Sequence, residues 1–193
     1  MTIYIASFVS MCYSPEVSFG TWAFGMLSAF ALLQKGQSLQ SIMFPLVITQ
    51  MQLVEGLQWI RAVDESTLAI LGKLVLFLQP VAAFYEAKKY AFVLPYVVAY
   101  GVMEALYGSR DLRFVVAEDG HLEWKWNFDP ISVAAVPYWI GLFVGASFLL
   151  PREVSLGMMA LFVYFFVNHA QYKTYGSLWC VWVNLLWVFY LVR

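Results

Sequence analysis

The sequence predicts an all-α polytopic membrane protein with seven transmembrane helices and a short extramembranous β-hairpin between the fourth and fifth helices. Three observations support this fold class. Hydrophobic residues occupy 62% of the 193 positions and charged residues 12%, whereas soluble domains are about half apolar and about a quarter charged. Apolar runs of roughly 20 residues, the length of a helix that crosses a bilayer, recur along the whole chain. One longer polar stretch, residues 108–130, interrupts them.

The apolar runs define the expected helices, because backbone polar groups inside hydrocarbon must be hydrogen-bonded within the chain. All of residues 1–193 are therefore expected to form a single transmembrane domain. Only the sequence EAKKY, at residues 86–90, separates the third run from the fourth. The expected spans are Val17–Leu33, Ser41–Ile60, Thr67–Tyr85, Tyr90–Tyr107, Ile131–Leu150, Val154–Ala170 and Gly176–Val192.

The polar stretch 108–130 carries the signals of a β-hairpin. The segments RFVV and HLEWKW flank the sequence AEDG, and an Asp-Gly pair between two strand-like segments favours a tight turn. We expect this hairpin to lie outside the membrane and to cover one end of the helix bundle as a lid.

Seven spans place the two ends of the chain on opposite sides of the membrane. We call the N-terminal side, with the connections after the second, fourth and sixth helices, side A, and the other side B. Five Lys or Arg residues outside the helices fall on each side, so the positive-inside rule leaves the orientation open. Side B is expected to be nearly featureless apart from Gln34, Glu86 and surface lysines.

Polar residues within the predicted spans gather in the side-A half. An ionisable side chain inside a membrane is costly, which makes it a functional-site hypothesis. Glu55 has glutamines three residues before and after it, on the same helix face. Tryptophans such as Trp124, Trp126 and Trp179 are more often residues of the membrane interface than of a binding site. The predicted ligand-binding residues are Gln52, Glu55, Gln58, Lys73, Gln79, Glu104, His121, His169 and Trp179.

These residues suggest a polar pocket on side A that binds a small polar molecule or an ion, for transport or sensing. The expected partners are this ligand and the lipid bilayer, and a homo-oligomer is compatible with the sequence. A net charge of −1 gives no indication of nucleic acid. The alternatives are a membrane-embedded, metal-dependent hydrolase of a lipid-like substrate, and a structural scaffold in which Glu55 and Lys73 form an ion pair. No retinal Schiff base is expected, since the last helix lacks a lysine.

The two cysteines, Cys12 and Cys180, are both expected on side A. They would form a disulfide if side A faces an oxidising compartment. Alternatively, Cys12, His121, His169 and Cys180 provide two thiolates and two imidazoles, a ligand set suited to tetrahedral zinc. The sequence leaves both arrangements open.

Short motifs spread over nearly the whole chain resemble an uncharacterised family of small seven-helix membrane proteins from bacteria and large DNA viruses. The matching segments are MCYSPEVSF, VEGLQW, FLQP, GHLEWKW and LWC. Family members typically begin at the Met-Cys pair, whereas ten residues precede it here. The resemblance implies no established activity. It directs attention to Cys12, Ser14, Glu55, Gln79, Pro80, His121, Trp179 and Cys180.

Overall fold

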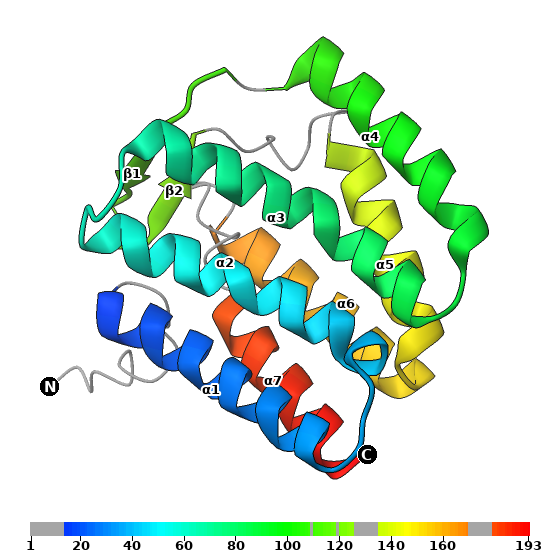
Figure 1. The fold of residues 1–193 in the computed structure, drawn as a ribbon. Coiled ribbons are helices and arrows are strands. Elements are labelled where there is room, and N and C mark those ends of the chain that lie inside the picture. Colours follow the sequence, from blue (N-terminus) through cyan, green and yellow to red (C-terminus); the bar gives the residue numbers. More distant parts are fainter. Residues whose placement is uncertain (1–13, 109, 119, 126–134, 170–178) are drawn as a thin grey trace, which may run out of the picture.

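The computed structural model describes residues 14–108, 110–118, 120–125, 135–169 and 179–193 (Figure 1), without the side chains of 162, 165, 166, 168, 169 and 179–182. Each of the seven predicted apolar segments contains an α-helix. The helices are α1 (Pro15–Gln34), α2 (Met43–Trp59), α3 (Glu65–Glu86), α4 (Val93–Tyr107), α5 (Val136–Leu149), α6 (Arg152–His169) and α7 (Trp179–Val192). Short 3₁₀ turns, η1 (Leu39–Ile42) and η2 (Tyr90–Phe92), precede α2 and α4.

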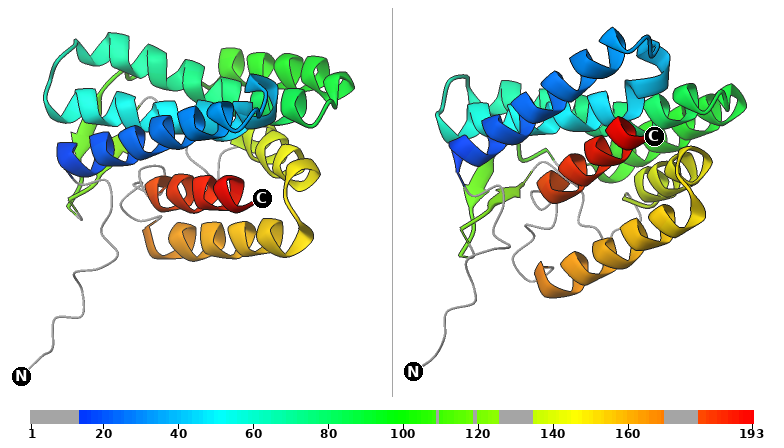
Figure 2. Two further views of the ribbon diagram at one scale, coloured as in Figure 1. Left: turned by 60° about the horizontal axis from the view of Figure 1, so that its bottom comes forward. Right: turned by 90° about the horizontal axis from the view of Figure 1, so that it is seen from below.

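The helices form two layers. Figure 2 shows α1, α2, α3 and α4 in one layer, with α6 and α7 in the other and α5 beside them. Within the first layer α2 packs between α1 and α3, and it also contacts α7. The start of α1, the α2–α3 connection and the hairpin lie at one end of the bundle, which corresponds to side A (Figure 1). The α1–α2 and α3–α4 connections and the end of α7 lie at side B.

Three helical segments of the described chain are long and apolar enough to cross a membrane, namely Pro15–Gln34, Glu65–Glu86 and Tyr90–Tyr107. The helix α2 has 17 residues, and α5 and α7 have 14 each. A helix of 14 residues is about 21 Å long, which is shorter than the hydrocarbon core of about 30 Å. Seven α-helices are therefore confirmed among the described residues, and seven membrane spans remain a prediction.

Small residues let α5 pack closely against α3. Gly141 and Gly145 lie one helical turn apart on α5 and face Pro80 and Ala83 of α3. A Cβ atom added at Gly145 would lie 2.7 Å from the Cβ of Ala83. Small residues spaced by four are common where membrane helices approach one another closely.

The helix α4 lies at the periphery of the bundle. Its buried residues are Tyr96 and Tyr100, and Tyr96 donates a hydrogen bond to the Phe77 carbonyl of α3 at 3.1 Å. The opposite face is an exposed apolar stripe of residues spaced by four: Leu94, Val98, Val102 and Leu106. Such a stripe suits contact with lipid.

The predicted β-hairpin is confirmed. The strands β1 (Phe114–Val116) and β2 (Leu122–Trp124) pair antiparallel, with Phe114 opposite Trp124. Gly120 in the turn has a φ of 81°, a left-handed conformation that glycine adopts without a steric cost. Its amide donates to the Ala117 carbonyl at 2.9 Å and closes the turn.

Candidate functional site

The carboxyl group of Glu55 is the centre of the side-A site. Glu55 is fully buried in α2, and Gln52 and Gln58 on the same helix face are also buried. Carboxylates are rarely buried completely unless they are paired or bound. A buried carboxylate flanked by two amides therefore forms a polar face within an otherwise apolar helix.

The hairpin lies next to the side-A end of α2 (Figure 1). Phe114, Leu122 and Trp124 of its strands are buried, and so is His121, which directly precedes β2. The indole of Trp124 lies close enough to the Glu55 carboxyl to interact with it. The hairpin consequently reaches the centre of the site. Trp124 is buried, which favours a place in the site over one at the membrane interface.

Near this end of the bundle, the polar atoms that are buried without a hydrogen-bond partner in the described part of the chain include the Ser18 hydroxyl of α1 and the side-chain carbonyl oxygen of Gln58. Buried polar groups in folded proteins nearly always have a partner, from the protein or from bound water. These two groups leave hydrogen-bonding capacity for a small polar molecule.

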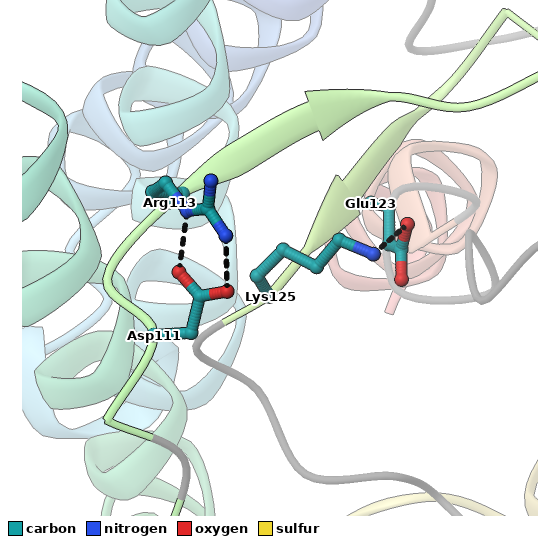
Figure 3. Close-up of polar contacts among 4 residues, drawn as sticks. All are labelled: Asp111, Arg113, Glu123 and Lys125. Atoms are coloured by element: carbon teal, nitrogen blue, oxygen red, sulfur yellow. Dashed lines mark hydrogen bonds and ion pairs between the residues drawn. The ribbon is translucent and has the colours of Figure 1, made fainter.

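Two ion pairs stiffen the base of the hairpin (Figure 3). Asp111 and Arg113 form a two-pronged contact of 2.7 and 2.8 Å, and the Lys125 ammonium lies 2.7 Å from the Glu123 carboxylate. The hydrogen bond from Arg113 holds the pKa of the exposed Asp111 carboxyl below its usual value. Asp111 therefore stays ionised near neutral pH and keeps its contact with Arg113.

The predicted residues Lys73 and Glu104 form an ion pair between α3 and α4. The Lys73 Nζ lies 2.6 Å from Glu104 Oε1, and about a quarter of each side chain is exposed. Lys73 thus neutralises Glu104. This ion pair connects the peripheral α4 to α3 in the side-A half of the bundle.

The predicted residue Gln79 belongs to the contact between α3 and α5. The Tyr138 hydroxyl of α5 donates to Gln79 Oε1 at 2.6 Å, and both side chains are buried. The adjacent Pro80 has no N–H, so the turn that contains Gln79 lacks one helical hydrogen bond. Side-chain bonds from Tyr138 and Tyr96 stabilise this weakened turn.

The zinc and disulfide predictions fall largely outside the described residues. Cys12 lies in the undescribed N-terminal segment, and His169 and Cys180 are placed only by their backbone, at the end of α6 and the start of α7. Trp179 is the first residue of α7 and is likewise placed by its backbone alone. Within the described part of the chain, no three His, Cys, Asp or Glu residues gather as a ligand set. Both arrangements stay predictions.

Side B is not featureless, and that expectation is wrong. A cavity of about 370 Å³ lies where the ends of α1, α3, α5 and α7 meet. Its polar lining comes from Gln37, Ser41, Glu86, Tyr190 and Arg193. The cavity arises because Glu86 and Arg193, far apart in sequence, end neighbouring helices on the same side. Sequence spacing alone does not show which helix ends are neighbours.

Comparison with protein-family models, with curated proteins and with solved structures gave no match for this chain. The resemblance to the uncharacterised seven-helix family stays a prediction.

Proposed function

We propose that this chain is a multi-pass integral membrane protein that binds a small polar ligand or ion at Glu55, for transport or sensing. Complete burial of Glu55 beneath the hairpin carries the proposal. A carboxylate inside a helix bundle is expensive to maintain, and such residues commonly mark the paths of ions or substrates.

The surrounding groups define the chemistry of the ligand. Gln52 and Gln58 can each donate and accept hydrogen bonds, and the Ser18 hydroxyl can do the same. A carboxylate prefers a cation or a hydrogen-bond donor. The site therefore suits a small cation, or a neutral molecule with several hydrogen-bond donors. In this proposal the hairpin acts as the lid, and Trp124 makes the contact that closes it over Glu55.

A thermal-stability screen of the purified protein in detergent tests the proposal. The probes are Na⁺, K⁺, ammonium, small primary amines and polyols. At least one probe is expected to raise the melting temperature of the wild type in a saturable way, and to lose this effect in Glu55→Gln. Glu118→Gln, which removes the same charge from the exposed hairpin turn, is the matched control and should respond as the wild type does.

Two results would contradict the proposal. One is the absence of any saturable stabilisation across the whole panel. The other is a probe that stabilises Glu55→Gln as strongly as the wild type. Either result would favour the structural scaffold, in which the polar face of α2 serves only to lock the helices and the hairpin together.

A further inference from the structure

The lining of the side-B cavity is largely polar, with some apolar side chains. Gln37 and Ser41 form one wall, where the Ser41 hydroxyl donates to Gln37 Oε1 at 3.1 Å. Leu32 and Ile42 contribute apolar surface. A volume of about 370 Å³ lies within the usual range for a small-molecule site, roughly 300–1,000 Å³.

The cavity continues into an apolar groove. A second hollow of about 480 Å³ shares Phe148, Leu149 and Arg193 with the first. Its other lining residues are apolar, and among them Phe189 and Val192 lie on α7. The groove therefore runs between the end of α5 and the end of α7, on a surface that would face lipid. A polar compartment and an apolar one meet at these shared residues.

Positive charge surrounds the junction of the two compartments. Arg193 lines both hollows, and the Lys89 ammonium lies 5.1 Å from the centre of the Phe148 ring. Among the described residues that line the two hollows, Glu86 is the one acid, and its oxygens already accept hydrogen bonds within the protein. The Tyr190 hydroxyl donates to Oε1 at 2.7 Å, and the Phe44 amide donates to Oε2 at 2.9 Å.

We propose that the side-B cavity and its groove form a binding site for one glycerophospholipid. The phosphate lies between Arg193 and Lys89, the polar head group extends toward Gln37 and Ser41, and one acyl chain occupies the groove along Phe189. Basic pockets between membrane helices are known to take phospholipid head groups. The proposal requires that the protein is inserted in a membrane, and it is independent of Glu55.

Binding of dioctanoyl phosphatidylglycerol tests the proposal. The full chain is purified in a non-ionic detergent with its tag at the N-terminus, so that Arg193 stays unobstructed, and the lipid is titrated by calorimetry. Saturable binding is expected. Arg193→Gln should weaken it by about tenfold or more, because a guanidinium–phosphate contact is a strong charge-assisted interaction. Lys89→Gln should weaken it in the same direction.

Arg152→Gln is the matched control. Arg152 is an exposed arginine at the start of α6, and it lines neither hollow. Its loss removes the same charge and should leave the affinity within about twofold. A general attraction between the anionic lipid and the basic side-B surface would instead weaken both arginine variants alike, which would overturn the proposal.

Two further ligands separate the parts of the lipid. Dioctanoylglycerol has the same chains without a phosphate, and glycerol 3-phosphate has the phosphate without chains. Both should bind much more weakly than the phospholipid. If dioctanoylglycerol binds as tightly as the phospholipid, the proposal is overturned and the groove binds apolar chains alone. If glycerol 3-phosphate binds as tightly, the proposal is also overturned and the cavity binds free phosphate esters. Glu55→Gln should bind the phospholipid as the wild type does, so failure of the Glu55 proposal is read separately.

Discussion

Single polar side chains cap the N-termini of three helices. Two of these caps come from the residue before the helix, and one comes from a neighbouring helix. Ser14 and Asp64 cap α1 and α3 from within the same segment, through bonds to the amides of Val17 and Thr67. The helix α2 has no such cap, and Glu86 of α3 supplies one by accepting from the Phe44 amide. The first amides of a helix lack internal partners, and they carry partial positive charge. Glu86 thus joins α2 to α3 at side B.

The cap formed by Asp64 predicts a pH-dependent contribution to stability. Its carboxylate accepts hydrogen bonds from the Ser66 hydroxyl at 2.7 Å and the Thr67 amide at 2.8 Å. These bonds hold the pKa of Asp64 below its ordinary value. A carboxyl whose pKa is lowered by folding stabilises the protein above its unfolded pKa, about 3.9, and loses that effect as the pH falls through the lower folded pKa.

Asp64→Ala should therefore lower the melting temperature at neutral pH, because it removes the cap of α3. Asp64→Asn should retain most of the stability, since asparagine is also a good cap. The difference in melting temperature between the wild type and Asp64→Ala should become smaller as the pH is lowered to about 3. The difference in melting temperature between the two variants should stay constant. If the difference in melting temperature between the wild type and Asp64→Ala does not change with pH, the charge of Asp64 contributes nothing to stability.

At the scale of elements, the contact between α3 and α5 depends on close backbone approach. Gly145→Ala places a Cβ 2.7 Å from the Cβ of Ala83, and neither group can rotate away. The helices must separate, which should destabilise the protein by about 1–3 kcal/mol. Chemical denaturation in mixed micelles would measure this change.

Gly101→Ala in α4 is the control for that experiment. A Cβ at this position meets no atom within 4 Å. The same substitution should be neutral, or stabilising by up to about 1 kcal/mol, because alanine favours a helix more than glycine does. Helix propensity favours alanine at both sites, so equal destabilisation at both sites would mean that the contact with Ala83 does not cause the effect.

The sequence predicts the positions of the helices and of the hairpin turn well, but it predicts the side-chain contacts between them poorly. Apolar runs predict helices because each run must satisfy its own backbone, and an Asp-Gly pair predicts a turn because of its local conformation. Both signals are local. The partners of Lys73 and Glu86 depend on which helices are neighbours and on their relative heights, and Glu104 and Tyr190 lie 31 and 104 residues away. The same limit explains why the sequence reveals neither the burial of Trp124 nor the side-B cavity.

At the scale of the whole molecule, seven spans predict that successive connections alternate between the two sides of the membrane. The short helices α2 and α5 test this most stringently. Single cysteines at Lys35 and Val63 flank α2, and single cysteines at Glu118 and Arg152 flank α5. In a background with Cys12 and Cys180 replaced by alanine, an impermeant maleimide should label one member of each pair in sealed vesicles and both after detergent is added.

Labelling of both members of a pair from outside would show that the helix between them does not cross. The exposed positions Lys35 and Arg152 should behave alike, because both lie on side B. If the cysteines at positions 152 and 35 are labelled from opposite sides, the alternating arrangement is contradicted, even if α2 and α5 each cross the membrane.

The peripheral position of α4 affects how freely its sequence can change. Its stripe of Leu94, Val98, Val102 and Leu106 contacts no other part of the described bundle closely enough to be buried. Lipid chains adapt to any shape, so they require these side chains to be apolar without fixing their size. Over evolutionary time α4 should drift among apolar residues while α2, where Glu55 and Thr49 are enclosed on all sides, keeps its identity. Relatives of this protein should therefore share α2 long after their α4 segments have become unrecognisable.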